Sequence, residues 1–157
     1  MVTDFFGALL KELGALISMP ELAPDQNNTC LIKFKGDVLV QIEVARDEYH
    51  VIIGSNLGEV PVGSYRNNLF EAALKANGLP PKRPSSGTFA FSQYAGQLVL
   101  FEMFNSKDVT GQTIADFLPS FLEKVKIWKE AIAKGDTPVI ETTFAAKPTG
   151  GMFGLRP

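Results

Sequence analysis

Histidine, cysteine and tryptophan are almost missing from this chain, which holds one residue of each type. The single histidine, His50, excludes histidine-rich metal sites and makes any histidine-dependent triad rest on one side chain. The lone Cys30 cannot close an internal disulfide, and its apolar neighbours in the sequence favour a buried thiol. Trp128 lies on the apolar stripe of a predicted helix and is expected in the core.

Neither a dominant charge nor a long apolar run is present. The net charge of −2 and the pI near 5.4 argue against binding nucleic acid mainly by neutralising phosphates. No apolar run approaches the roughly 20 residues that span a bilayer. The N-terminal residues Met1-Val2-Thr3-Asp4 contain no basic leader. We therefore expect a cytoplasmic protein that neither enters a membrane nor binds nucleic acid.

The motifs of common enzymes are also missing. The sequence has no P-loop, no Gly-x-Gly-x-x-Gly after a strand, and no nucleophile-elbow serine to accompany His50. We expect no catalytic residue, no metal site and no cofactor. Two carboxylates still stand out, because Glu43 and Glu102 lie in otherwise apolar predicted strands. Either one is a candidate to pair with Lys33, Lys35 or a basic side chain of a partner.

The composition is that of an ordinary globular protein. Apolar residues make up 45% of the 157 residues and charged residues 20%, which suffices for one hydrophobic core. Periodicity is lost after Gly135, and the last residues include the turn-forming run Pro148-Thr149-Gly150-Gly151. We expect a single domain at 1–134 and a mobile C-terminal tail at 135–157.

Apolar residues at helical spacing predict three helices, over Phe5–Ile17, Ser64–Asn77 and Ile114–Ile132. Asn77-Gly78 is a stop signal for the second helix. Pro119 lies near the start of the third, so its first turn is expected to be short or kinked.

Alternating apolar residues predict five strands: Thr29–Lys35, Val38–Ala45, Tyr49–Ile53, Thr88–Tyr94 and Gln97–Phe104. Gly36-Asp37 predicts a two-residue hairpin, and the short connections predict an antiparallel meander for the first three strands. Gly54–Gly63 is expected to be a loop, and Leu79–Gly87 an irregular connector. The last strand is apolar on both sides and is expected to be central.

The predicted order is helix, three strands, helix, two strands, helix. This order resembles that of the class I chaperones of bacterial type III secretion, the family that includes the Tir chaperone. The resemblance covers residues from about 4 to 134 and is carried by Phe5–Gly14 (FFGALLKELG), Val38–Val44 (VLVQIEV), Asn67–Asn77 (NNLFEAALKAN) and Phe117–Trp128 (FLPSFLEKVKIW). It implies an α+β fold in which helices pack on a curved, mainly antiparallel five-stranded sheet.

The resemblance also implies a function. Such a protein is a cytoplasmic bacterial homodimer that captures the N-terminal segment of a secreted effector in an extended form and does not hydrolyse ATP. The resemblance also implies the secretion ATPase as a further partner. Dimers of the family bury the middle helix and a neighbouring strand, which points to Leu69, Phe70, Ala73, Leu74, Phe89 and Phe91. The alternative is that these side chains pack under their own sheet.

For effector contact we favour the first helix and first hairpin, which carry more apolar side chains than one small layer requires. The candidates are Phe5, Leu9, Leu13, Leu31, Ile32 and Phe34. A core role is equally open for them. An edge strand at Thr29–Lys35 would accept an effector strand through main-chain hydrogen bonds, with adjacent pockets for alternate side chains.

Two other function classes are considered. A small-ligand or regulatory sensing domain would use the same sheet and helices, with the surplus apolar residues lining a closed pocket. A dimer with an open groove would argue against it. An enzyme is the third class, and it would depend on His50.

Overall fold

The computed structural model describes residues 2–78 and 86–140 of the chain. Its elements follow the predicted order, so the predicted α+β class is confirmed. They are α1 (Val2–Leu16), β1 (Thr29–Phe34), β2 (Val38–Val44), β3 (His50–Glu59), α2 (Ser64–Asn77), β4 (Thr88–Ser92), β5 (Gln97–Asn105) and α3 (Gly111–Lys134). Most of the expected connector, at 79–85, and most of the expected mobile tail, at 141–157, lie outside the described residues.

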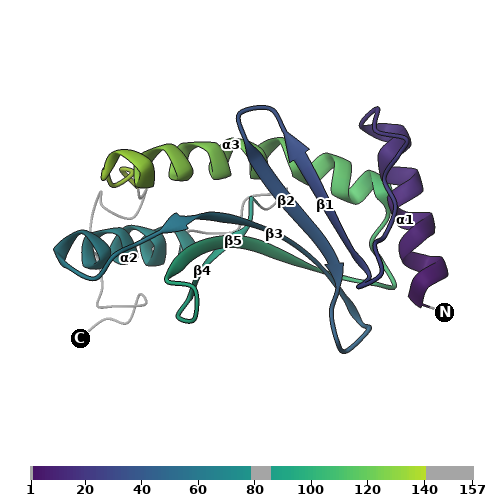
Figure 1. Cartoon of the computed structure of the whole chain (residues 1–157), viewed down its shortest axis with the longest axis horizontal. Coiled ribbons are helices and arrows are strands. Elements are labelled where there is room, and N and C mark those ends of the chain that lie inside the picture. The colour runs from purple at the N-terminus through teal and green to yellow at the C-terminus, as the bar shows by residue number, and fades with distance from the viewer. Residues whose placement is uncertain (1, 79–85, 141–157) are drawn as a thin grey trace, which may run out of the picture.

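The five strands form one antiparallel sheet in the order β1-β2-β3-β5-β4 (Figure 1). β1 and β4 are therefore its edges. β5 pairs with β3 on one side and with β4 on the other, which confirms that it is a central strand.

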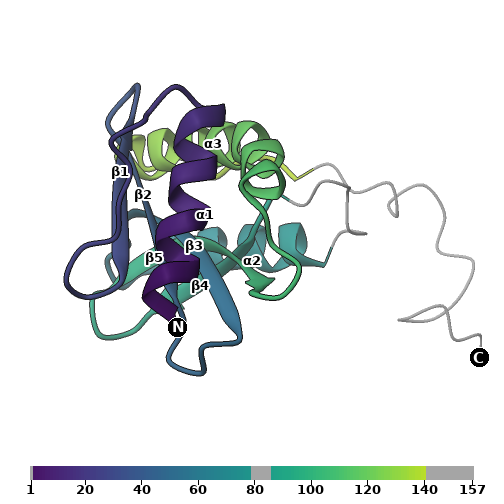
Figure 2. The same cartoon turned by 90° about the vertical axis from the view of Figure 1, so that its right-hand side faces the viewer.

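All three helices lie on one face of this sheet. α1 and α3 pack beside each other, and Figure 2 shows both on the same side of the β1–β2 hairpin. α2 joins them on that face, because its Phe70 contacts Phe91 of β4. Cys30 and Trp128 are buried in this layer, as predicted. The opposite face of the sheet carries no helix among the described residues.

β3 is longer than predicted. The expected loop at Gly54–Gly63 is wrong for residues 54–59, because β3 continues to Glu59 and pairs there with β5; only residues 60–63 form the connection to α2. A register irregularity between Asn56 and Gly58 accommodates the glycine, whose φ is 128°. Pairing with a neighbouring strand outweighs the low strand preference of the two glycines.

The first hairpin also differs from the prediction. β1 ends at Phe34, so the connection to Val38 has three residues and not two. Cys30 pairs with Ile42 and Ile32 with Val40, and all four side chains point into the core. A two-residue turn would shift the register by one and bring inward residues opposite outward ones.

α3 begins at Gly111, earlier than predicted. The side chains of Thr110 and Thr113 form a capping box around its first turn. Pro119 consequently lies in the helix interior, and the expectation that it distorts the first turn is wrong. Gly111 has a separate role, since a Cβ there would lie 2.7 Å from the backbone nitrogen of Leu13. The glycine allows α1 and α3 to approach closely.

Candidate functional site

A groove lies where the end of α1, the β1–β2 hairpin and α3 meet. We name it the hairpin groove; its volume is about 600 Å³, and it is lined by Ile17, Met19, Lys33, Phe34, Lys35, Val38, Leu122, Glu123 and Lys126. Apolar side chains from three elements form its walls, and three of its four charged side chains are lysines. The groove therefore suits a segment with apolar side chains and negative charge.

A hydrogen bond joins the hairpin to α3, and an ion pair lies within the hairpin. Lys129 of α3 donates from Nζ to the backbone oxygen of Asp37 at 2.6 Å. Nζ of Lys33 lies 3.4 Å from Oδ1 of the same aspartate. These contacts fix one wall of the groove, although each is at the surface and contributes little to stability.

The six side chains predicted to contact an effector lie in three different environments: the core, the hairpin groove, and the opposite face of the sheet. Leu9, Leu13 and Ile32 are core residues, with 4%, 0% and 2% of their surface exposed, so they offer no surface for contact. Leu9 and Leu13 are buried where α1 packs against α3, and Ile32 is buried because it points from β1 into the core. Phe34 lines the hairpin groove. Phe5 is half-buried and packs on the core.

Leu31, the sixth, lies on the other side of the sheet and is 62% exposed. It stands on the edge strand, as predicted for Thr29–Lys35. The backbone N–H of Thr29 donates to Oδ1 of Asp25, and its carbonyl accepts from the N–H of Asp25. Both groups of Thr29 thus point away from β2. Since the direction alternates along an antiparallel strand, the N–H and C=O groups of Leu31 and Lys33 point outward too.

A second hollow lies between α2 and β4. We name it the α2 face; its volume is about 140 Å³, and it is lined by Phe70, Ala73, Leu74, Asn77, Phe89, Ala90, Phe91 and Leu98. Five of the six residues predicted for a dimer interface therefore meet here, and the sixth, Leu69, is a buried residue of α2 that does not line the hollow. Leu74 is 71% exposed, whereas Leu69, Ala73 and Phe89 are buried.

An arginine supports the aromatic part of the α2 face. The rings of Phe70 and Phe91 lie 4.8 Å apart, and the guanidinium of Arg66 lies 4.9 Å from the centre of the Phe91 ring. Arg66 also donates from Nε to the backbone oxygen of Val60 at 2.9 Å. Stacking and hydrogen bonding together hold these side chains in place.

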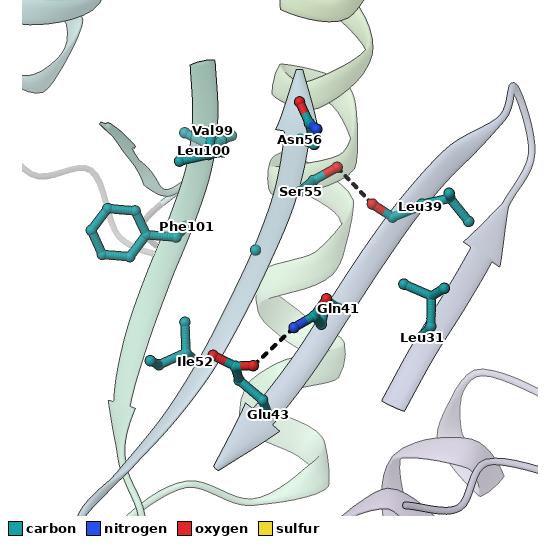
Figure 3. A pocket seen from close by; sticks show the side chains of 11 residues that line it. Leu31, Leu39, Gln41, Glu43, Ile52, Ser55, Asn56, Val99, Leu100 and Phe101 are labelled. Carbon is teal, nitrogen blue, oxygen red and sulfur yellow. Dashed lines mark hydrogen bonds between the residues drawn. The ribbon is translucent and has the colours of Figure 1, made fainter. Parts of the chain in front are cut away.

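The helix-free face of the sheet carries a third hollow, which was not predicted from the sequence. We name it the open sheet face; the hollow has a volume of about 370 Å³ (Figure 3). Leu31, Leu39 and Phe101 line it, and Met103 is exposed on the same face. The sequence does contain an indication of this apolar face, because Leu31 and Leu39 occupy outward positions that would be polar on a solvated face.

The two singled-out carboxylates lie on opposite faces. Glu43 lines the open sheet face and accepts a hydrogen bond from Nε2 of Gln41 at 2.8 Å (Figure 3). Glu102 pairs in register with the inward residue Ile53 and lies on the helix side. Lys33, proposed as a partner of Glu43, contacts Asp37 instead.

His50 has a local structural role. Its Nδ1 lies 2.7 Å from Oδ2 of Asp47 in the turn before β3. The hydrogen bond from His50 is the main reason that the pKa of Asp47 is lowered. In residues 2–78 and 86–140, no three His, Cys, Asp or Glu side chains come together to hold a metal ion. None of the helices described is long and apolar enough to cross a membrane.

Residues 8–129 match the model of the Tir chaperone protein (CesT) family. A search of curated proteins finds no significant sequence match.

Three solved structures are similar in fold. A chain in the complex of the Yersinia pestis type III secretion chaperone SycH with a fragment of YscM2 is 16% identical, with a TM-score of 0.62 over 78% of this chain and 98% of that one. A chain of the HopA1–SchA chaperone–effector complex is 14% identical, with a TM-score of 0.61 over 82% and 96%. A chain of the heterodimeric ExoU–SpcU complex from the type III secretion system of Pseudomonas aeruginosa is 15% identical, with a TM-score of 0.51 over 88% and 100%.

Proposed function

This chain belongs to the Tir chaperone protein (CesT) family of non-enzymatic type III secretion chaperones, which bind effectors, and we propose how it binds one. It holds the N-terminal segment of the effector, here called the client, in an extended and secretion-competent form. It does so without hydrolysing ATP.

The observation that carries this proposal is the position of β1. β1 is an edge strand, and the backbone groups of Leu31 and Lys33 point outward from it. A client strand that pairs there gains main-chain hydrogen bonds whatever its sequence. The hairpin groove, with Phe34 in its wall, lies beside the same strand and takes client side chains. Backbone pairing supplies affinity and the groove supplies specificity.

We further propose that the chaperone is a homodimer formed through the α2 face. Leu74 is 71% exposed there, beside the half-buried rings of Phe70 and Phe91. An exposed leucine next to aromatic rings and a shallow hollow favours an isologous contact, in which Leu74 of each copy enters the hollow of the other. β1 lies at the opposite edge of the sheet, so dimerisation leaves both client sites accessible.

The proposed location is the bacterial cytoplasm, where a client is made and held before export. A client kept extended has not gained its own folding energy, so its release costs only the contacts with the chaperone. We assign that release to the ATPase of the secretion system as a further partner.

A sensing domain with a closed ligand pocket is the alternative. The hairpin groove, the α2 face and the open sheet face are all open at the surface, and none of the three is enclosed. This geometry suits an extended polypeptide better than a sequestered small molecule.

The test is native purification from the source bacterium followed by mass spectrometry of the intact complex. Two copies of this chain with one copy of a larger secreted protein, bound through its N-terminal part, are expected. A monomer or dimer that holds only a small molecule would instead support the sensing domain.

A further inference from the structure

The centre of the open sheet face lacks a side chain. The register aligns Gln41, Gly54 and Phe101 across β2, β3 and β5, and all three line the hollow, so the glycine lies at its floor. Leu39 and Ile52 are among the side chains around it. The result is an apolar depression in the middle of a sheet, bordered by the edge strand β1.

The backbone does not require glycine at position 54. Its φ is not positive, and a Cβ placed there would meet its nearest neighbours, Leu100 O and Phe101 Cβ, at 3.6 and 3.7 Å. Those are ordinary contacts, so a Cβ at this position would fit without strain. Glycine weakens a strand, and in a strand interior it often marks a bulge, a tight bend, or a site where a ligand or another backbone approaches closely. The pairing of β3 with β5 is regular at Gly54, so a close approach is the explanation that fits here. Gly54 keeps the hollow open.

One charged side chain lines this hollow. Glu43 is half-buried, and its Oε2 accepts the hydrogen bond from Gln41. The other carboxylate oxygen has no hydrogen-bond partner among the described residues, and Ile52 is the cross-strand neighbour of Glu43 on this face (Figure 3). A carboxylate beside an apolar wall is complementary to a lysine or arginine whose aliphatic stem covers that wall.

We infer that the open sheet face is a second client-binding surface, which takes an apolar side chain over Gly54 and a client lysine or arginine at Glu43. This inference rests on the proposed function. A strand paired with β1 would lie about 14 Å from β3, so a segment that continues from it must cross the sheet to reach the hollow. Leu31 belongs to both the edge strand and this face and connects the two surfaces.

The two surfaces differ in charge and therefore select different client segments. The hairpin groove carries Lys33, Lys35 and Lys126 and favours acidic residues, whereas the open sheet face carries Glu43 and favours a basic one. A client thus has an acidic, apolar stretch and a basic, apolar stretch on either side of the strand that pairs with β1.

Two short synthetic peptides serve as probes. Both alternate valine or leucine with serine, and they differ in one central residue, lysine or glutamate. They are titrated into the isotope-labelled full chain, and amide signals are followed by NMR. The lysine peptide is expected to shift the signals of Ile52, Gly54 and Phe101 and to bind about five-fold more tightly than the glutamate peptide. The variant Glu43→Gln is expected to remove this difference.

A second variant tests the hollow itself. Gly54→Val fills the depression and is expected to weaken binding of the lysine peptide roughly tenfold while thermal stability is kept or raised. Thr88→Val, at an exposed edge position outside the hollow, is the matched control and is expected to bind like the wild type.

Equal affinity for both peptides, or unchanged binding by Gly54→Val, would overturn the inference. The inference would also be overturned if the NMR signals of this face shifted with protein concentration in the absence of peptide, because a second copy of the chain would then cover the face. Client co-purification distinguishes the two proposals. A client captured equally by wild type and Gly54→Val leaves the proposed function intact and removes this inference, whereas failure of the wild type to hold any client removes the proposed function.

Discussion

The side chain of Asn77 pairs with the backbone of Phe89 through two hydrogen bonds. Nδ2 of Asn77 donates to the carbonyl oxygen of Phe89 at 2.9 Å, and the N–H of Phe89 donates to Oδ1 of Asn77 at 2.8 Å. The amide thereby occupies the place that a neighbouring strand would take on β4, and it joins the last residue of α2 to this edge of the sheet. The α2 face depends on this connection.

Replacing Asn77 with alanine removes both bonds and leaves a partly buried backbone pair without partners. We expect Asn77→Ala to lower the free energy of unfolding by about 1–3 kcal/mol, measured by urea denaturation. Asn68→Ala, an exposed asparagine of the same helix, is the control and is expected to change stability by less than about 0.5 kcal/mol. Equal effects of the two changes would show that the pairing is not stabilising.

The dimer proposal is tested at Leu74, because Leu69 is fully buried and an aspartate there would unfold the monomer as well. We expect Leu74→Asp to keep the fold but to weaken dimerisation at least about 100-fold, since a carboxylate in the interface lacks a partner. Sedimentation measures the change. Ile127→Asp, at a residue that is 51% exposed on α3, is the matched control and is expected to remain dimeric. If Leu74→Asp dimerises as strongly as the wild type, the interface lies elsewhere.

Strand pairing at β1 is tested at Lys33. Its N–H points away from β2, so Lys33→Pro removes no bond of the sheet but blocks an added strand. We expect client binding to fall about tenfold or more in Lys33→Pro and less than about threefold in Lys33→Ala, which removes the side chain alone. Calorimetric titration with the co-purified client segment measures both. Similar losses in the two variants would assign the effect to charge and not to backbone pairing.

Cys30 is 5% exposed, and burial is the main reason that the pKa of its thiol is raised. The thiolate is the reactive form, so native Cys30 is expected to react with a thiol reagent at pH 8 at least about tenfold more slowly than the same chain in urea. Spectrophotometric assay of the released thiol dye measures both rates. Equal rates would mean that β1 opens readily in the native protein.

The turn at Asp47 makes the stability of the fold depend on pH. The pKa of Asp47 is lowered in the fold, first by the hydrogen bond from His50, so the ionised form is favoured in the native state. This contribution is present above the unfolded pKa of about 3.9 and is lost as pH falls through the lower folded value. We expect Asp47→Asn to unfold less steeply with pH below about 4 than the wild type. Parallel acid-unfolding curves followed by circular dichroism would contradict this.

Local patterns were sufficient for most of the fold. The alternation in Val38–Val44 and the helical stripe ending at Asn77-Gly78 predicted their elements correctly. The alternation in the first two strands also indicates the register of the first hairpin, because inward residues must pair with inward residues. The turn signal Gly36-Asp37 favoured a turn one residue shorter, which is incompatible with that register. β3 was cut short at Gly54 because glycine is a local signal, whereas its pairing with Phe101 is not local.

The surfaces were harder to predict. Leu9 and Leu31 are both leucines in amphipathic segments, yet one is 4% exposed and the other 62%. The difference depends on how α1 packs against α3 and on which sheet face the helices cover. Neither is encoded within a short window of sequence. The α2 face was found because a family resemblance pointed to it, not because the sequence of α2 distinguishes Leu74 from Leu69.

The exposed edge of β1 also bears on how the chain behaves when no client is bound. Such a strand is a template for pairing with any extended polypeptide, including β1 of another copy, and sheets that grow in this way lead to aggregation. Lys33 and Lys35 oppose this, because two copies pairing through β1 bring positive charges together. An excess of this chain over its client is therefore expected to lower solubility, and the two lysines act against that loss.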